Sequence, residues 1–464
     1  MYLDKPREEC GVVGIWNHPH AAALTGNALI AMQHRGEEAA GVATTSGGRV
    51  YLLKGQGLVA NVLERKETDS LKGDAAIGHN RYSLSGDRDA TNVQPFAMDK
   101  GYNPDQTSAG EQIDYGPIFI QAYQHSPFAI AHNGQINRGL EEMLYEGRSD
   151  SKALAAMISK LQKNTRQNII DALRRVKGSY ALVILTPDML VGARDPEGYR
   201  PLSLGSIDNA LLLASETCAF NQIGAHFIRD INPGEVLFIG KKGLHSDYVY
   251  AGSPPPRREC IFEHIYLARQ DSVVFGESVY EIRLKLGQIL AKECPVNADL
   301  ALGVPDAGNV YAKGFAKELG IDHASEGLDR SHYVGRVFIQ PGHESRLAGA
   351  DLKFFPIPQV IRGKRIVLID DSIVRGVNIA ACVKKLRACG AKEIHVRIAS
   401  PPYISACNWG VDTYETSKLI ALNRNMGEII TQLKVDSLQY LSLEGMLSAF
   451  NNPEYKCMHC FERH

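Results

Sequence analysis

Three apolar runs in the second half of the chain alternate with amphipathic segments, and this alternation constrains the fold more than any other feature. The runs are DLALGV, KRIVLID and EIHVRIAS, at 299–304, 364–370 and 393–400. Helical patterns over 309–319 and 378–389 follow the first two runs, and each stops at a glycine. Continuous apolar strands that alternate with helices predict parallel βαβ units, with ligands beyond the carboxyl ends of the strands. We therefore expect an α/β domain with a parallel sheet here.

The first half has a different sequence pattern, with many short β-like runs and only two helical patterns, near 21–33 and 151–163. Turn-forming residues separate the runs, which predicts stacked sheets flanked by helices. Residues 97–126 are polar and rich in turn-formers, so we expect a loop there. The β-like runs are at 10–16, 40–44, 50–55, 75–82, 128–134, 179–185, 210–215 and 235–240.

A proline-rich segment, AGSPPPRR at 251–258, separates these two halves of the chain. Three consecutive prolines cannot join a central strand or continue a helix, so this segment is predicted to be a linker. It divides the chain into an expected first domain at 10–250 and a second at 259–464, after a short leader at 1–9.

Composition narrows the class of protein. The 464 residues carry a formal net charge of -1, which gives no electrostatic reason to expect nucleic acid or an anionic membrane as partner. No run approaches the roughly 18 apolar residues of a membrane span, and the charged leader has no apolar signal core. Nine scattered cysteines argue against a secreted disulfide framework. We expect a cytoplasmic protein.

Cys10 stands at the start of the first predicted strand. A single cysteine in this position is ordinarily a buried packing residue. Removal of residues 1–9 would instead give Cys10 a free α-amine, which titrates near pH 7.7–8.0 and can act as base for its own thiol. That interpretation requires other parts of a site.

Five polar segments supply candidate parts at the turns that flank the strands. Together with Cys10 they resemble class II glutamine amidotransferase domains, which have an N-terminal nucleophile (Ntn) hydrolase fold, an αββα sandwich. The segments are QHRGEEAAG (33–41), GHNRYSLSG (78–86), NVQPF (92–96), AHNGQI (131–136) and SDS (149–151).

The resemblance implies a role for each matching residue. The thiol of the cysteine would attack the glutamine amide, an arginine and an aspartate would hold the substrate's α-carboxylate and α-ammonium, and an Asn-Gly pair would form the oxyanion hole. These residues are Cys10, Arg81, Asp150, Asn133 and Gly134, and Arg35 resembles a further arginine of the glutamine site.

Four other cysteines form a possible metal set. Cys457 and Cys460 make a C-x-x-C pair near the C-terminus, which by itself suits a zinc half-site or a redox pair. Cys260 and Cys407 complete four thiols, a number that suits zinc and an iron–sulfur cluster equally. The other cysteines, Cys218, Cys294, Cys382 and Cys389, are predicted to be packing residues.

The run IVLIDDSIVRGVN at 366–378 places two acids at the end of a predicted strand, before a helix. The helix N-terminus suits a phosphate. Asp370 and Asp371 would repel a phosphate but suit ribose hydroxyls or a magnesium shell. We therefore expect a phosphorylated sugar as ligand.

Further segments resemble one family. DDSIVRG (370–376), CIFEHIYLARQDS (260–272), GVPDAGN (303–309) and HYVGRVFIQP (332–341) are similar to the amidophosphoribosyltransferases, whose second domain is a type I phosphoribosyltransferase. The resemblance is to the branch with a propeptide, here 1–9, and a [4Fe–4S] cluster.

Membership of this family would imply amination of phosphoribosyl pyrophosphate by glutamine, the first step of purine synthesis. It would also imply Mg²⁺ and a homotetramer. The implied cluster ligands are Cys260, Cys407, Cys457 and Cys460, and Mg²⁺ would be held by Asp370 and Asp371, directly or through water. The implied phosphoribosyl pyrophosphate contacts are Pro305, Asp306, Arg330, Tyr333, Arg336, Lys353, Asp370, Asp371, Ser372, Arg375, Gly376 and Asn378.

Three departures from the family pattern bear on phosphate binding, beside the milder changes at Arg330 and Glu37. Val377 and Asn378 stand where two threonines usually bind the 5′-phosphate, and Ala307 replaces a serine of the pyrophosphate loop. Losing a hydrogen bond to a charged group costs roughly 1.5–3 kcal/mol. Two alternatives follow: a paralogue that keeps glutaminase activity but uses another phosphosugar acceptor, and a regulator that binds phosphoribosyl pyrophosphate without turnover.

Overall fold

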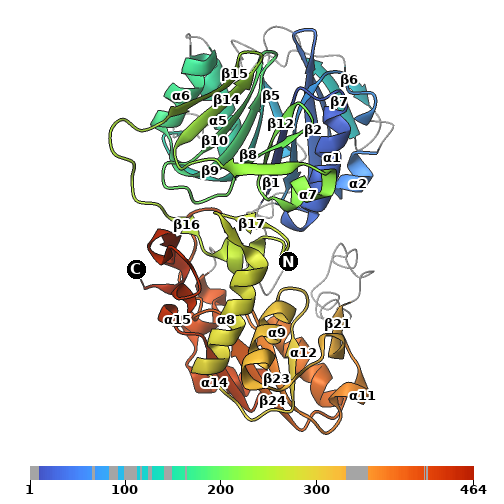
Figure 1. Cartoon of the computed structure of the whole chain (residues 1–464), viewed down its shortest axis with the longest axis vertical. Coiled ribbons are helices and arrows are strands. Elements are labelled where there is room, and N and C mark those ends of the chain that lie inside the picture. Colours follow the sequence, from blue (N-terminus) through green and yellow to red (C-terminus); the bar gives the residue numbers. More distant parts are fainter. Residues whose placement is uncertain are drawn as a thin grey trace.

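The computed structural model describes residues 10–64, 68–82, 92–98, 112–114, 118–123, 128–140, 149–161, 165–330, 354–411, 413 and 416–463. Figure 1 shows a strand-rich part above a part in which helices surround a smaller sheet. Within the described residues, no helix is both long enough and apolar enough to cross a membrane.

Two antiparallel sheets form the strand-rich part. In the described residues the larger sheet has nine strands, in the order β13-β11-β12-β1-β4-β2-β3-β7-β6. Their bounds are β1 Gly11–Trp16, β2 Ala39–Ser46, β3 Arg49–Gln56, β4 Ala75–Arg81, β6 Gln112–Asp114, β7 Ile118–Tyr123, β11 Ser203–Ile207, β12 Ala210–Ala214 and β13 His226–Asp230.

The smaller antiparallel sheet has six strands in the described residues, in the order β15-β14-β10-β9-β8-β5. Their bounds are β5 Phe96–Met98, β8 Phe128–Arg138, β9 Lys177–Leu185, β10 Met189–Arg194, β14 Glu235–Gly240 and β15 Gly243–Tyr248.

The two sheets pack face to face, with helices on both outer faces (Figure 1). Val12 and Ile77 of the larger sheet share one buried cluster with Ala129 and Val183 of the smaller sheet. Separate clusters lie between the larger sheet and α1 and α7, and between the smaller sheet and α5 and α6. This is the predicted αββα sandwich. The helix bounds are α1 Ala21–Ala31, α2 Val59–Val62, α5 Asp150–Lys160, α6 Thr165–Arg175 and α7 Cys218–Ile223.

The prediction of a loop over 97–126 is wrong at 97–98, which end β5, and over β6 and β7. Strand β7 pairs along β3, from Gly55↔Ile118 to Val50↔Tyr123, and β6 pairs with β7. The segment IFIQAY at 118–123 is rich in β-forming residues, but the polar sequence before it dominated the prediction.

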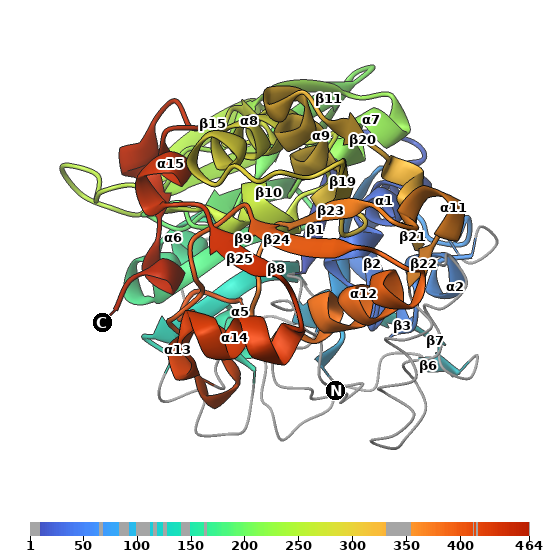
Figure 2. The ribbon, with the colours of Figure 1, turned by 90° about the horizontal axis from the view of Figure 1, so that it is seen from below.

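A five-stranded parallel sheet forms the centre of the second part, in the order β20-β19-β23-β24-β25 among the described residues. Val367 and Ile369 of β23 pack on the side of α8 and α9, whereas Ile366 and Leu368 pack on the side of α12 and α14. Figure 2 shows these helix pairs on opposite sides of the sheet. A continuous apolar run is therefore buried on both faces, as predicted.

Helices α9 and α12 of this part begin and end within one residue of the predicted bounds. The bounds are α8 Val279–Glu293, α9 Gly308–Leu319, α11 Pro358–Ile361, α12 Val377–Ala388, α13 Ile420–Asn423, α14 Met426–Leu433 and α15 Leu443–Leu447. The five strands are β19 Leu300–Gly303, β20 Asp322–His323, β23 Arg365–Asp370, β24 Glu393–Ile398 and β25 Ser437–Tyr440.

Short strand pairs complete the second part. One of them is parallel and joins the segment after the proline-rich stretch to the C-terminal tail, with Cys260 opposite Cys457. The pairs are β16 Glu259–Cys260 with β26 Lys456–Cys457, β17 Val273–Val274 with β18 Glu277–Ser278, and β21 Leu328–Arg330 with β22 Phe354–Pro356.

Candidate active site and four-cysteine cavity

Cys10 directly precedes β1, and its neighbours fix the start of that strand. Its Sγ donates to the carbonyl of Tyr82 at 3.5 Å. The side chain of Asn80 accepts a hydrogen bond from the N–H of Gly11 at 2.7 Å and donates to the carbonyl of Met32 at 2.5 Å. Sequence reasoning missed Asn80, although it lies inside the GHNRY segment next to Arg81.

The predicted oxyanion-hole residues lie on β8. Asn133 is 1% exposed, and neither polar atom of its side chain has a hydrogen-bond partner among the described residues. A buried polar group without a partner costs about 1–3 kcal/mol, so this amide is poised for a ligand. Gly134 has a φ of 139°, which a residue with a side chain rarely adopts.

Asp150 and Arg81 occupy the ends of regular elements near this strand. The two carboxylate oxygens of Asp150 accept hydrogen bonds from the N–H groups of Ile136 and Ser151, at 3.0 and 2.7 Å. An ionised carboxylate has about four acceptor sites, so Asp150 can still bind an ammonium group. Arg81 ends β4 and is half-buried.

Arg35 is almost wholly buried and makes contacts with the protein itself. Its Nε donates to the carbonyl of Cys10 at 3.2 Å. Its terminal nitrogens donate to Glu216 at 2.6 Å and to both carboxylate oxygens of Glu263, at 2.9 and 3.0 Å. Arg35 therefore holds the nucleophile's carbonyl, and its predicted contact with glutamine stays a prediction.

Glu216 is the centre of this buried network. It also accepts from His34 Nε2 at 2.9 Å, from the N–H of Arg269 at 2.9 Å and from Ser272 Oγ at 2.8 Å. Burial alone would raise the pKa of Glu216, but the charges of His34 and Arg35 lower it below its usual range. The carboxylate is thus ionised when folded. Glu216 lies in the run ASETCAF at 214–220 and Glu263 in CIFEHIYLARQDS at 260–272, and their pairing with Arg35 could not be predicted from spacing.

A cavity of about 350 Å³ lies beside the carboxyl end of β19 and is lined from both parts of the molecule. Four of the predicted phosphoribosyl pyrophosphate contacts line it, namely Pro305, Asp306, Arg330 and Asn378. Arg330 Nη1 lies 2.7 Å from Asp306 Oδ2. His34 and Arg269, which both contact Glu216, also line the cavity.

The other predicted contacts are less accessible or are not described. Asp370 ends β23 and Asp371 directly follows it. Both are fully buried, and Asp371 Oδ1 accepts from Ser372 Oγ at 2.7 Å. Gly376 has a φ of 85° and precedes α12, with Arg375 beside it. Of the 370–378 segment, only Asn378 lines the cavity. Tyr333, Arg336 and Lys353 lie outside the described residues.

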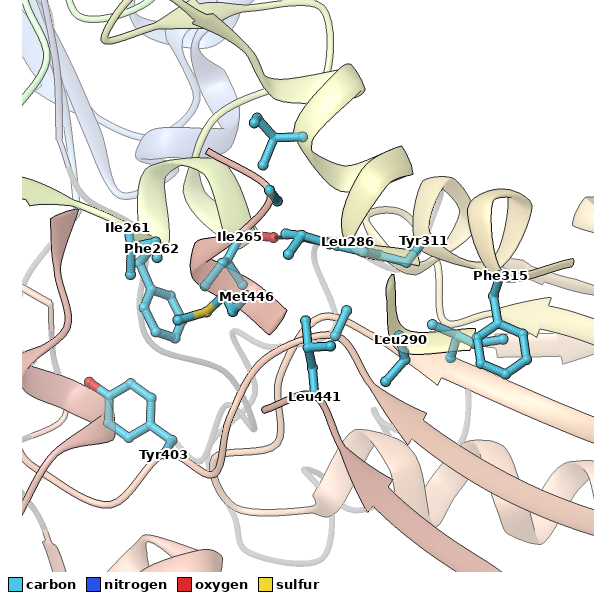
Figure 3. Packing of buried hydrophobic residues seen from close by; sticks show 14 of the residues in the cluster. Ile261, Phe262, Ile265, Leu286, Leu290, Tyr311, Phe315, Tyr403, Leu441 and Met446 are labelled. Atoms are coloured by element: carbon cyan, nitrogen blue, oxygen red, sulfur yellow. Dashed lines mark hydrogen bonds between the residues drawn. The ribbon is translucent and has the colours of Figure 1, made fainter. Parts of the chain in front are cut away.

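All four cysteines of the predicted metal set line a second, small cavity of about 20 Å³. Its other walls are largely aromatic, and Phe262 meets Tyr403 edge to face at 5.4 Å. Figure 3 shows Phe262 in the apolar cluster with Ile261, Ile265 and Met446. Burial raises the pKa of Cys460 well above its usual value and that of Cys457 to about 11, so loading a metal centre would release protons.

The donor set of this cavity is four cysteine thiols, a number that suits one zinc ion and a four-iron cluster equally. Within the described residues, no three His, Cys, Asp or Glu side chains are grouped closely enough to ligate a metal ion. The chemistry of the residues around the cavity therefore fits either metal centre.

Lys456 anchors the tail that carries two of these cysteines. Its buried Nζ lies 2.9 Å from Glu259 and 3.0 Å from Glu277. Together with the β16–β26 pair, this ion-pair cluster fixes Cys260 next to Cys457.

Comparison with known proteins decides the family. A family model described as a glutamine amidotransferase domain matches residues 114–222. Amidophosphoribosyltransferase 2 of Arabidopsis thaliana, a chloroplastic protein, is 41% identical over 99% of this chain and 80% of that protein. The chain belongs to the amidophosphoribosyltransferase family.

Other amidophosphoribosyltransferases support the same conclusion. The protein of Synechococcus elongatus is 42% identical over 96% of this chain and 88% of its own length. The solved glutamine phosphoribosylpyrophosphate amidotransferase of B. subtilis, complexed with ADP and GMP, is 37% identical with a TM-score of 0.85, over 97% of this chain and 96% of that one. The predicted fold class, an Ntn sandwich followed by a phosphoribosyltransferase domain, is confirmed.

Proposed function

We propose that this chain converts phosphoribosyl pyrophosphate and glutamine to 5-phosphoribosylamine, glutamate and pyrophosphate, the first step of de novo purine synthesis. The observation that carries the proposal is the make-up of the larger cavity. On the side of the first part it is lined by His34, whose neighbour Arg35 binds the carbonyl of Cys10. On the side of the second part it is lined by Pro305 and Arg330, near the parallel sheet. A glutamine site and a phosphosugar site that adjoin in this way suit the transfer of ammonia from one to the other.

The first half-reaction is hydrolysis of glutamine. The thiolate of Cys10 attacks the side-chain amide carbon, and the oxyanion that forms accepts hydrogen bonds from the Asn133 amide and the Gly134 N–H. The C–N bond then breaks, ammonia leaves, and water hydrolyses the thioester to glutamate. The amide of Asn133, which is buried and has no hydrogen-bond partner in the part of the chain that the structure describes, supports this role.

Proton transfer and orientation come from the surrounding groups. Removal of residues 1–9 gives Cys10 an α-amine that takes the thiol proton and passes it to the leaving ammonia. Arg81 suits the α-carboxylate of glutamine through its planar guanidinium, and Asp150 suits the α-ammonium.

The second half-reaction takes place at the larger cavity. Ammonia attacks C1 of phosphoribosyl pyrophosphate and pyrophosphate leaves, with Arg330 placed to neutralise part of its charge. From the family resemblance we infer that Asp370 and Asp371 bind the ribose hydroxyls and that Ser372, Arg375, Gly376 and Asn378 bind the 5′-phosphate, and of these Asn378 lines the cavity. Mg²⁺, held with the pyrophosphate and by the two aspartates directly or through water, would balance the charge of the leaving group.

The four-cysteine cavity would hold a [4Fe–4S] cluster through Cys260, Cys407, Cys457 and Cys460. When bound, the cluster would cross-link the start of the second domain, the 407 loop and the C-terminal tail. A homotetramer and a cytoplasmic location remain predictions from the family resemblance and the composition.

Release of both products tests the proposal. We expect the protein purified without oxygen to release glutamate and pyrophosphate from glutamine and phosphoribosyl pyrophosphate. Cys10→Ala should abolish the glutamine-dependent release of both products but keep pyrophosphate release with added ammonia. Cys389→Ala should retain the glutamine-dependent and the ammonia-dependent activity. Glutamate release without pyrophosphate release would instead favour a paralogue with another acceptor. Binding of phosphoribosyl pyrophosphate without any turnover would favour the regulator.

A further inference from the structure

A loop of the second domain that contains Asn408 and Trp409 contacts β8, the strand that carries the predicted oxyanion hole, and its neighbour β9. The carbonyl of Trp409 accepts hydrogen bonds from Ser179 Oγ at 2.6 Å and from Arg200 Nη2. Asn137, three residues after Gly134, donates to the carbonyl of Asn408 at 2.7 Å. These main-chain acceptors lie 271 positions from Asn137 of β8 and 230 positions from Ser179 of β9 in the sequence.

Ser179 connects this loop to the oxyanion-hole strand. It lies on β9 opposite Gln135, and Tyr180 lies opposite Gly134. Its buried hydroxyl accepts from the N–H of Gln135 at 3.1 Å while it donates to Trp409. One side chain therefore joins the residue after Gly134 to the second domain.

Arg200 connects the same loop to the nucleophile. Its side chain is fully buried, and its Nη1 lies 3.6 Å from Glu263 Oε1. Glu263 binds Arg35, and Arg35 binds the Cys10 carbonyl. The contacts run from Cys10 through Arg35, Glu263 and Arg200 to Trp409, and from there to β8.

We propose that Ser179 and Arg200 are positioning residues for glutamine hydrolysis, which hold Gly134 and Cys10 in register through the Trp409 carbonyl and the Glu263 carboxylate of the second domain. This proposal rests on the proposed glutaminase function. Neither residue needs to touch glutamine, and a small displacement of either reacting group is enough to slow the reaction.

Gly410 offers an independent way to disturb the same register. Its φ is 108°, and a Cβ on it would lie 3.4 Å from the carbonyl carbon of Gly134 and 3.0 Å from Arg200 Nη2. Gly252 has a similar φ of 90°, but a Cβ on it would meet no atom of the described residues within 4 Å, its chain neighbours aside. Gly410→Ala and Gly252→Ala therefore share the backbone strain, and only Gly410→Ala crowds Arg200 Nη2 and brings a methyl group into contact with Gly134.

The test compares Ser179→Ala with Ser203→Ala, and Gly410→Ala with Gly252→Ala, in the full-length protein. Ser203 is a buried serine on β11 whose hydroxyl donates to Asp230 at 2.7 Å. Asp230 lies on β13, an end strand of the larger sheet, whereas Ser179 lies on β9 of the smaller sheet. We measure kcat and KM for glutamate release, pyrophosphate release with added ammonia, and the rate of Cys10 alkylation by iodoacetamide.

We expect kcat for glutamate release to fall about 10- to 100-fold in Ser179→Ala and Gly410→Ala, with KM for glutamine unchanged. The ammonia-dependent reaction and the alkylation rate in Ser179→Ala should match those of Ser203→Ala. An unchanged kcat, or an equal loss of the ammonia-dependent reaction, would overturn the proposal. Absence of glutamate release from the wild-type protein would overturn the proposed function instead. Arg200→Lys, which keeps the charge but loses the planar fork, should lower kcat in the same way.

Discussion

Arg35 and Glu263 join the two halves of the molecule through a buried two-point ion pair. The distances are 2.9 Å from Arg35 Nη1 to Glu263 Oε2 and 3.0 Å from Arg35 Nη2 to Glu263 Oε1. The side chains are 1% and 0% exposed. Since Arg35 also donates to the carbonyl of Cys10, a carboxylate of the second domain helps to fix the nucleophile of the first.

Replacing this carboxylate by an amide should weaken both the fold and glutamine hydrolysis. Removing one partner of a buried ion pair costs about 3–5 kcal/mol, because the other charge stays buried. Glu216 still neutralises Arg35, so we expect Glu263→Gln to lower the free energy of unfolding by about 3 kcal/mol. Urea denaturation measures this loss.

The exposed Glu454 supplies the control for that measurement. Glu454→Gln should change the free energy of unfolding by less than about 0.5 kcal/mol. If Glu263→Gln proves as stable as Glu454→Gln, the ion pair contributes nothing to holding the domains together.

The stability contributed by Glu216 should depend on pH. Its pKa is lowered in the folded protein by His34 and Arg35, which outweigh the opposite effect of burial. A lowered carboxyl pKa stabilises the fold above the unfolded value of about 4.3, and this stabilisation is lost as the pH falls toward the folded pKa. We therefore expect the free energy of unfolding to be higher in the wild type than in Glu216→Gln, and this difference to be largest at neutral pH. Urea denaturation of both proteins from pH 7 to pH 3 measures the difference, and a difference independent of pH would contradict the assignment.

Restoring hydroxyls at the start of α12 should strengthen binding of the phosphosugar. Asn378 lines the larger cavity, and Val377 is the first residue of the helix. A hydrogen bond to a charged phosphate is worth roughly 1.5–3 kcal/mol, so Val377→Thr with Asn378→Thr should lower KM for phosphoribosyl pyrophosphate about tenfold. The ammonia-dependent reaction measures this without glutamine hydrolysis, while KM for glutamine serves as the internal control. An unchanged KM for phosphoribosyl pyrophosphate would show that the 5′-phosphate binds elsewhere.

Removing one of the four cysteines should remove iron. We expect the protein prepared without oxygen to contain iron and acid-labile sulfide, and Cys460→Ala to lose most of both, because the cluster needs four thiolates. Cys382→Ala is the matched control, since Cys382 is buried on the other side of the parallel sheet, against α14 rather than the aromatic cavity. Zinc without sulfide in the wild type would rule out the cluster.

Local patterns explain which parts of the fold were predictable. Apolar alternation and turn residues act over a few positions, so strands such as β1, β9 and β23 and the glycine that ends α9 could be predicted from the sequence. Strand β7 was missed because its neighbours are polar and its pairing partner, β3, lies more than 60 residues earlier. Pairing at that distance leaves no local signal.

The same division applies to the site. The candidate chemistry could be predicted from the sequence, since Cys10, Asn133, Asp370 and the four-cysteine set are residue types that stand in recognisable segments. The contacts of Arg35 with Glu263 and of the Trp409 carbonyl with Ser179 become visible only in the folded chain. These contacts join residues more than 200 positions apart, and they form because packing of the two domains buries their charges and main-chain groups together, where each must find a partner.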